Sequence, residues 1–438
     1  MLDELKALAE QAVSMAKEAG ASDAWSNVSR SRSVDLSYRD GKLEKTQEAT
    51  SRGLELRVYA DGRYSTHSTS DLRPDRLKSF VADAVGLTRA LQPDPFRFIP
   101  DPALFAGRSA ANLETVDSSL AALTAEDRLA ICRDLDESTR ASDRVISATS
   151  WVSDGQAASA SASSNGFSGT QEQTWLWYGS DVSVRDEGDK RPEEGHYVGA
   201  HHRAGLPSAA EVGKISLERA LSRLGSAKGP TLRGAMVVDA RASARLISSA
   251  LGPATARSIQ QGRSFWRDQL GKQLFGAALT VTDEPLLPKG MASRAYDDEG
   301  IALKTMPLIE AGVAKNLYID TYYGKKAGLT PTTGTATNRV VKPGAESLDA
   351  LLARAGSGVY VTSWLGGNAD STTGDFSFGL RGFRIEGGKI GAPVGEMNVT
   401  GNLSTILKQL VALGNDPFPY SSTLCPSLLF DGVQFSGA

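Results

Sequence analysis

The stretch Val34-Asp35-Leu36-Ser37-Tyr38-Arg39-Asp40-Gly41 decides the fold of the first part of the chain. Its apolar side chains alternate with polar ones, which is typical of a β-strand that buries one face. The stretch Leu54-Glu55-Leu56-Arg57-Val58 repeats this alternation and is followed by Asp61-Gly62. Because glycine accepts the positive φ of a tight turn, each Asp-Gly pair predicts a β-hairpin.

Helical spacing of apolar residues occurs on both sides of these strands. It predicts a first helix that contains Leu5 to Ala16 and stops at Gly20. Further helices are predicted over residues 74–91, 124–140, 208–225 and 241–251. The helix at 124 begins with Thr124 and Asp127, a weak form of the capping box. Prolines between 93 and 102 predict a connector.

The remaining segments are expected to be mainly strands. Residues 143–204 look β-rich, and the Ala/Ser-rich run 157–165 is predicted to be a packed strand because tryptophans flank it. Residues 235–238 predict a buried strand, and the C-terminal half predicts short strands with one late helix at about 402–413. Strands and helices do not alternate strictly, which favours an α+β fold.

We therefore predict an N-terminal α/β-type domain with a mixed sheet and helices, and a C-terminal domain rich in antiparallel β-strands. The expected boundaries are residues 1–92 for the first domain and 93–228 for a middle α+β segment that packs with it. The C-terminal β-rich domain is expected to cover residues 229–438.

Composition excludes several classes of protein. With 438 residues and a formal net charge of −3, the chain has no global basic field for nucleic acid or an anionic membrane. Two cysteines, Cys132 and Cys425, exclude a disulfide framework and indicate a reducing compartment. No secretory signal or membrane-spanning run of about 20 apolar residues is evident. The sequence predicts a soluble cytoplasmic protein.

The histidines are the first candidates for metal binding. His196, His201 and His202 follow two glutamates in the segment 193–202. The segment alternates like a strand, and there residues five apart point to opposite faces. This favours surface or strand-end histidines, with a metal role as the alternative. No Gly-x-Ser-x-Gly elbow is present, and neither cysteine has a catalytic context.

Two acidic segments remain open to more than one interpretation. Asp297 and Asp298, in Asp-Asp-Glu-Gly, could bind a cation or form a polar turn. Asp375, between glycines and aromatic residues, could accept hydrogen bonds in a turn or face a cleft. From the residues alone the sequence predicts only an α+β protein of unassigned function.

The order of several motifs matches a known family. Each motif is weak alone, but their order and spacing are specific. They are Gly20–Ala24, Gly53–Val58, Ser68–Leu72, Ser264–Phe265, Leu270–Gln273, Tyr296–Gly300, Leu308–Val313, Thr333–Gly334, Thr373–Ser377, Gly382–Phe383, Pro393–Val394, Gly401–Leu403 and Gly414–Asp416. Over nearly its whole length the chain resembles the TldD/PmbA family, once called modulators of DNA gyrase and grouped with metallopeptidases.

The resemblance implies one of two kinds of subunit. TldD-like chains carry His-Glu-x-x-x-His on a helix, whereas PmbA or TldE chains lack it and pair with TldD in a zinc metallopeptidase that degrades unfolded peptides or trims peptide precursors. The corresponding helix here, residues 242–251, contains neither histidine nor glutamate. The chain is thus expected to be the non-metallated TldE/PmbA-type subunit. No metal or catalytic residue is expected in it, and zinc is expected in a TldD-like partner.

Further expectations follow from the same resemblance. Cys425 lies where TldD-like chains complete their zinc site, and without histidine partners it is expected to be a packed thiol. The partner is a TldD-like chain in a heterodimer, or a second copy in a homodimer, and the substrates are unfolded peptides, with no nucleic acid or membrane. Substrate binding is predicted at Asp297, Asp298, Gly334, Gly374, Asp375, Phe376 and Ser377. The alternatives are a homo-oligomeric peptide-binding scaffold without catalysis and an independent hydrolase using His196, His201 or Cys425.

Overall fold

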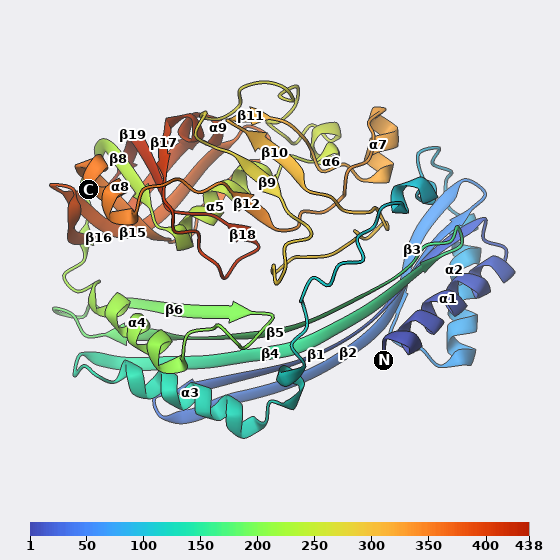
Figure 1. Ribbon diagram of the computed structural model, residues 1–438, viewed down its shortest axis with the longest axis horizontal. Helices are drawn as coiled ribbons and strands as arrows, with labels where there is room; N and C mark the ends of the chain where they lie inside the picture. The colour runs from blue at the N-terminus through green and yellow to red at the C-terminus, as the bar shows by residue number, and fades with distance from the viewer. Residues whose placement is uncertain (438) are drawn as a thin grey trace.

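Two long hairpins build the N-terminal part of the chain. The computed structural model describes residues 1–437 and shows these hairpins as a long curved sheet (Figure 1). The strands follow the order β3-β2-β1-β4-β5-β6. Asp40 and Gly41 have φ angles of 50° and 81°, so the predicted tight turn is confirmed. The strands are β1 (Asp23–Arg39), β2 (Lys42–Ala60), β3 (Arg63–Thr69), β4 (Val145–Ser163), β5 (Ser168–Val184) and β6 (Glu193–Ala200).

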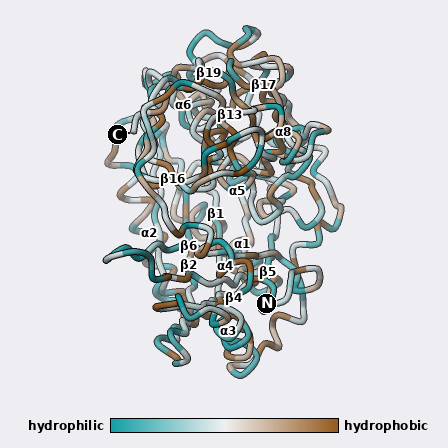
Figure 2. The backbone as a smooth tube through the Cα atoms, turned by 90° about the vertical axis from the view of Figure 1, so that its left-hand side faces the viewer, coloured by the Kyte–Doolittle hydropathy of each residue, from teal (hydrophilic) through white to brown (hydrophobic). Residues whose placement is uncertain are grey.

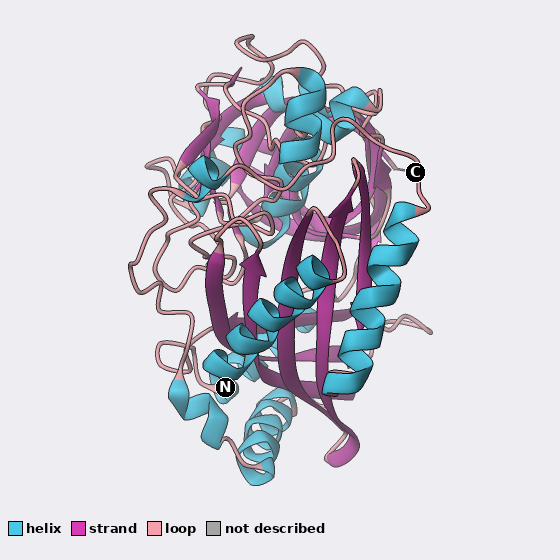
Figure 3. Cartoon of the chain, turned by 90° about the vertical axis from the view of Figure 1, so that its right-hand side faces the viewer, coloured by secondary structure: helices cyan, strands magenta, loops and turns pink. Residues whose placement is uncertain are grey.

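The helices of this part cover the outer face of the curved sheet. Thr124 and Asp127 form the predicted capping box at the start of α3. Figure 1 places α3 on the side of the sheet away from the C-terminal part, and Figure 3 shows α1 packed across the strands. The predicted helices are confirmed as α1 (Leu2–Glu18), α2 (Pro74–Arg89), α3 (Ala125–Thr139) and α4 (Ala209–Leu221).

The Ala/Ser-rich run forms a packed strand, as predicted. Ala158, Ala160 and Ala162 of β4 are at most 3% exposed and pack in one core with Ala9 and Ala12 of α1. Small side chains let the helix approach the sheet closely. The residues between these alanines belong to the opposite, inner face, because side chains alternate along a strand.

The C-terminal part contains two sheets and a shared core. One has eight strands, with β14-β15-β13-β8-β19-β16-β7 in order and β17 paired to β19; the other follows β11-β10-β9-β12-β18. Figure 2 shows hydrophobic segments gathered inside this part, around β13. The strands are β7 (Ala227–Lys228), β8 (Leu232–Val238), β9 (Val281–Asp283), β10 (Met306–Glu310), β11 (Val313–Ala314), β12 (Arg339–Val341), β13 (Ser357–Trp364), β14 (Asn368–Ala369), β15 (Asp375–Glu386), β16 (Lys389–Asn402), β17 (Leu410–Leu413), β18 (Thr423–Leu424) and β19 (Leu428–Ser436).

The α+β class is confirmed, but the strand directions are distributed differently from the expectation. Every neighbouring pair in the N-terminal sheet is antiparallel, so that sheet is not mixed. The parallel pairs among residues 1–437 are β8 with β13, β7 with β16 and β12 with β18, all in the C-terminal part. Two-residue turns such as Asp40-Gly41 can join only antiparallel neighbours, whereas parallel pairs need longer crossovers.

The late helix predicted at 402–413 is wrong. Only residues 403–409 are helical, and residues 410–413 pair with β19 as β17. Pairing with a strand distant in the sequence overrides the local helical pattern there. The C-terminal helices are α5 (Ala240–Leu251), α6 (Ala256–Gln260), α7 (Thr321–Ala327), α8 (Leu348–Ala355) and α9 (Leu403–Ile406). Within residues 1–437, no helix combines the length and apolar character needed to cross a membrane.

Candidate functional site

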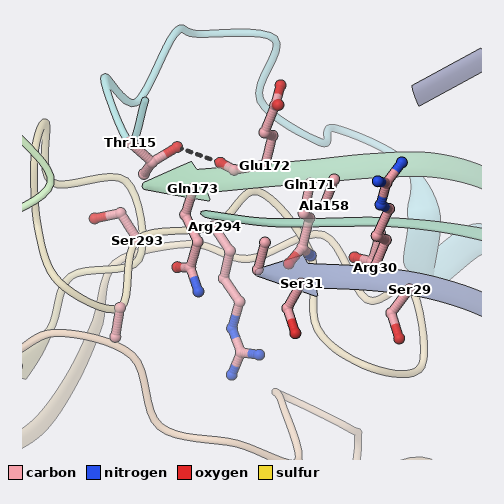
Figure 4. Close-up of a pocket in the computed structure, with 13 residues that line it drawn as sticks. Ser29, Arg30, Ser31, Thr115, Ala158, Gln171, Glu172, Gln173, Ser293 and Arg294 are labelled. Carbon is pink, nitrogen blue, oxygen red and sulfur yellow. Dashed lines mark hydrogen bonds between the residues drawn. The ribbon is translucent and has the colours of Figure 1, made fainter. Parts of the chain in front are cut away.

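Two adjoining cavities lie between the inner face of the curved sheet and residues 292–298. Each has a volume of about 340 Å³, and they share Ser29, Ser159 and Gln171 as lining residues. We call the cavity that reaches Arg294 the Arg294 pocket (Figure 4) and the one that reaches Asp298 the Asp298 pocket. Together they form a groove whose floor is the sheet and whose roof is residues 292–300, here called loop 292–300.

The floor of the groove consists mainly of small polar side chains. Ser29 of β1 lies opposite Ser159 of β4, which lies opposite Gln171 of β5. In the next row Asn27 lies opposite Ser161, and the Asn27 Nδ2 donates to the Ser161 Oγ at 2.8 Å. Hydroxyl and amide groups both donate and accept hydrogen bonds. This floor can therefore bind a ligand that offers both donors and acceptors.

The roof is held in place by a buried carboxylate. Asp297 is 2% exposed, and its Oδ1 accepts from the main-chain N–H groups of Glu299 and Ile301, each at 3.0 Å. Its Oδ2 accepts from the Thr333 hydroxyl at 3.0 Å and from the Gly334 N–H at 3.1 Å. Burial raises the pKa of Asp297, and these hydrogen bonds oppose that shift. The side chain thus positions loop 292–300 against residues 333–334.

Neighbouring residues fix the rest of the loop. The Glu299 carboxylate accepts from the Thr321 N–H at 2.8 Å and from its hydroxyl at 2.7 Å, and burial raises the pKa of Glu299. Arg57 of β2 donates from Nη1 to the Asp298 carbonyl at 2.8 Å. Gln171 donates from Nε2 to the Tyr296 carbonyl at 3.2 Å. The curved sheet is therefore bonded directly to the loop above it.

Arg294 is a cation of the loop with few partners. Its side chain is 19% exposed, and its Nη1 lies 3.6 Å from the Asp298 carboxylate. The Nη2 donates to the Ala336 carbonyl at 3.3 Å, and the buried Nε has no hydrogen-bond partner. In Figure 4 the guanidinium points to the same side as Ser31 and Gln173.

The predicted substrate-binding residues fall into two groups. Asp297, Asp298 and Gly334 meet at loop 292–300, where Asp298 lines a pocket with an exposed side chain. The second group, residues 374–377, lies at the start of β15 in the eight-stranded sheet. Within residues 1–437, no hydrogen bond joins the two groups. Substrate binding by either group stays a prediction.

The second group combines turn contacts with alternating burial. The Asp375 carboxylate accepts from the Asn402 Nδ2 and the Thr373 hydroxyl, each at 2.9 Å, and these bonds lower its pKa. Asp375 is thus a turn acceptor, although its side chain remains exposed. Phe376 is buried, and Ser377 is exposed on the other face. Gly374 has a φ of 85°, which a side chain would strain.

Helix α5, which the family resemblance equates with the zinc helix of TldD-like chains, contains no histidine, cysteine, aspartate or glutamate. Arg245 of α5 donates from Nη2 to the carbonyls of Gly366 and Gly367 at 3.0 and 2.8 Å. Its guanidinium lies 4.4 Å from the Phe378 ring centroid. Cys425 is fully buried, and burial raises the pKa of its thiol to about 12, so it is protonated near neutral pH. Zinc takes thiolate, imidazole or carboxylate ligands, which this set does not supply.

The histidines do not form a site in the described chain. The Nδ1 of His201 lies 2.6 Å from the Thr174 carbonyl and its Nε2 lies 3.2 Å from the Gly290 carbonyl, so both ring nitrogens face protein acceptors. His202 contacts the Glu114 carbonyl through Nε2 at 2.8 Å. Burial lowers the pKa of His196 to about 4. Residues 1–437 contain no group of three or more His, Cys, Asp or Glu side chains that could hold a metal ion.

Sequence reasoning missed the floor of the groove and the role of Arg294. The sequence does show a polar face on each strand, because serines recur at every second position after Ser29 and between the alanines of β4. Nothing in one strand alone indicates that its polar face meets Gln171 or loop 292–300. That juxtaposition depends on contacts between segments more than 100 residues apart.

Comparison with known proteins agrees with this architecture. Three descriptions of one metallopeptidase family match in order: PmbA/TldA metallopeptidase domain 1 over residues 27–88, the central domain over 118–224 and the C-terminal domain over 232–437. Metalloprotease PmbA of Escherichia coli O157:H7 is 27% identical over 98% of this chain and 96% of that protein.

Solved structures give the same result. A putative modulator of DNA gyrase from Bacteroides thetaiotaomicron superposes with a TM-score of 0.95 and 37% identity, covering 100% of this chain and 99% of that one. TldE from Thermococcus kodakarensis has a TM-score of 0.87 over 98% of this chain and 100% of that one, and its 17% identity supports the fold alone. The fold is that of a metallopeptidase-type protein. The chain belongs to the PmbA/TldD family.

Proposed function

We propose that this chain is the non-metallated TldE/PmbA-type subunit of a cytoplasmic zinc metallopeptidase. The observation that carries the proposal is α5, where Arg245 and serines stand in place of the histidines and glutamate of a zinc helix. Arg245 donates to the main-chain carbonyls of Gly366 and Gly367 and packs on Phe378, so this side chain joins α5 to residues 366–367 and to β15. A zinc-bearing TldD-like partner would supply the metal-activated water for peptide hydrolysis.

In this proposal the chain shapes the chamber and holds extended peptide. The groove under loop 292–300 offers neutral donors and acceptors from Asn27, Ser29 and Gln171. These groups match the alternating N–H and C=O groups of a peptide main chain. Asp298 and Ser377 are two predicted site residues with exposed side chains that a ligand could reach. Unfolded peptides and peptide precursors are the proposed substrates.

Metal analysis and co-purification test this assignment. The isolated chain should contain no stoichiometric zinc and should not cleave an unfolded peptide. Capture of the chain from native cells should recover a zinc-bearing member of the same family. Recovery of a homo-oligomer without such a chain favours the alternative, a peptide-binding scaffold without catalysis. Stoichiometric zinc that is lost on His201→Ala would favour an independent hydrolase.

A further inference from the structure

The Arg294 pocket contains a cation that is largely removed from water but poorly paired. The closest carboxylate oxygen, on Asp298, is 3.6 Å away, and the only hydrogen bond of the guanidinium within residues 1–437, to Ala336, is 3.3 Å long. The Asp298 side chain is itself 66% exposed, so water screens this pair. A desolvated charge is costly unless it is paired and hydrogen-bonded. The guanidinium therefore favours an anionic ligand that offers acceptors.

The side chains on the guanidinium side of the Arg294 pocket favour an anion of low charge. Figure 4 shows Ser29, Ser31 and Gln173 pointing to the same side as the guanidinium, and all three side chains are uncharged. The Arg30 and Glu172 side chains point to the opposite side. A single planar guanidinium matches a carboxylate, which it can bind through two parallel hydrogen bonds. A phosphate, with about two negative charges, would be better matched by several cations.

We propose that the Arg294 pocket binds the free C-terminal carboxylate of an extended peptide. The peptide chain continues from Arg294 over Ser29 and Ser159 into the Asp298 pocket, because the two cavities share these lining residues. The floor hydroxyls and amides then bond the main chain of the peptide. This inference rests on the proposed function, because that function makes peptide the ligand class. An Asp or Glu side chain of the peptide also carries a carboxylate. The experiment below distinguishes a side-chain carboxylate from the C-terminal one.

Peptide binding to the full chain, without a zinc-bearing partner, tests the proposal. Three fluorescent peptides of the same neutral sequence are compared by anisotropy in a buffer free of carboxylates. The first has a free C-terminus, the second a C-terminal amide, and the third an amide plus one internal glutamate that restores the charge. The free acid should bind at least about tenfold more tightly than either amide. Equal affinities, a glutamate-containing amide that matches the free acid, or no binding of the free acid would overturn the proposal.

Two variants with the same change in charge show whether Arg294 is responsible. Arg294→Gln should remove the preference for the free acid, whereas Arg30→Gln should keep it, because Arg30 points away from the pocket. A preference that survives in Arg294→Gln overturns the proposal. If this variant fails to fold, the affinities of the free-acid and amide peptides for the unchanged chain still test the proposal.

The peptide-binding experiment and the partner-stimulation experiment can fail independently of each other. Preference for the free acid without any stimulation of a zinc-bearing partner would leave the Arg294 site intact and contradict the subunit assignment. Stimulation of the partner without such a preference would contradict the Arg294 site alone.

Discussion

The Asp297 carboxylate accepts a hydrogen bond from the Gly334 N–H at 3.1 Å and thereby joins two segments that carry the family resemblance. The two residues are 37 positions apart, and the same carboxylate also holds the turn of its own loop. Both oxygens of a buried aspartate are thus used within the protein. The Asp297 carboxylate accepts four hydrogen bonds, whereas that of Glu299 accepts two.

Replacing Asp297 with asparagine should destabilise the protein. An asparagine keeps one acceptor oxygen and turns its NH₂ group toward donors on one side, which leaves buried N–H or O–H groups unpaired. The free energy of unfolding should fall by about 1–3 kcal/mol. Denaturant unfolding measures this, with Asp298→Asn as the control, because the Asp298 side chain is 66% exposed and its loss should cost less than about 0.5 kcal/mol. Equal effects of the two variants would contradict the role of Asp297.

The half-buried Glu299 should leave a signature in the pH dependence of stability. Burial raises its pKa in the folded protein above the unfolded value, so between these two values the folded state binds more protons. The contribution of Glu299 to stability is therefore fully present below the unfolded pKa and declines as the pH rises through the folded pKa. Glu299→Gln removes this dependence, so the stability of the unchanged protein relative to the variant should fall as the pH rises from about 4. Thermal unfolding in a pH series measures the difference, and a rise instead of a fall would show the sign to be wrong.

A tryptophan packed on a glycine supports the inner face of the curved sheet. Trp177 of β5 lies opposite Gly199 of β6, and a Cβ at position 199 would lie 2.1 Å from ring atoms of Trp177. Gly199→Ala should therefore destabilise the protein by about 1–3 kcal/mol through overpacking. Gly86 on α2 has open space around it, so Gly86→Ala should stabilise by about 1 kcal/mol. Thermal unfolding of both variants measures these changes. An unchanged melting temperature in Gly199→Ala would rule out the close contact with Trp177.

A buried ion pair ties α3 to the sheet. Arg128 donates from Nη2 to Asp154 of β4 at 2.8 Å, and the two side chains are 5% and 3% exposed. Arg128→Met should cost about 3–5 kcal/mol because Asp154 is left charged and unpaired. The matched change Arg133→Met breaks the pair with Glu126, whose side chains are 46% and 72% exposed, and should cost less than about 1 kcal/mol. Similar losses in both variants would argue against burial as the cause.

Short sequence patterns correctly predicted the turns and helix caps, which are stabilised by residues adjacent in the sequence. The Asp40-Gly41 turn and the Thr124 cap appear where the residues place them, because turns and caps need only neighbouring groups. Residues 410–413 became a strand because β19, remote in the sequence, supplies their partners. Short helices such as α7 also depend on contacts outside the helix. The Thr321 N–H at the start of α7 donates to the Glu299 carboxylate.

The sequence predicted the site residues that lie in motifs, but not those whose role depends on contacts made in the fold. Asp297 and Gly334 belong to recognisable motifs, and the structure joins them by a hydrogen bond. Arg294 lies two residues before the Tyr296–Gly300 motif, but its poor pairing is a property of the folded loop. The floor residues Asn27 and Ser161 are ordinary polar positions until the antiparallel pairing brings them together.

The rate of peptide cleavage by a zinc-bearing TldD-like partner, measured while this chain is added to it, shows whether this chain is the metal-free subunit of a zinc peptidase. Chelator-sensitive cleavage should rise with added chain and saturate near equal amounts of the two proteins, while this chain alone stays inactive. Saturation reports formation of a complex, and chelator sensitivity assigns the chemistry to the partner's metal. Equal cleavage by this chain alone, or no change in the partner's rate at any ratio, would contradict its assignment as the metal-free subunit.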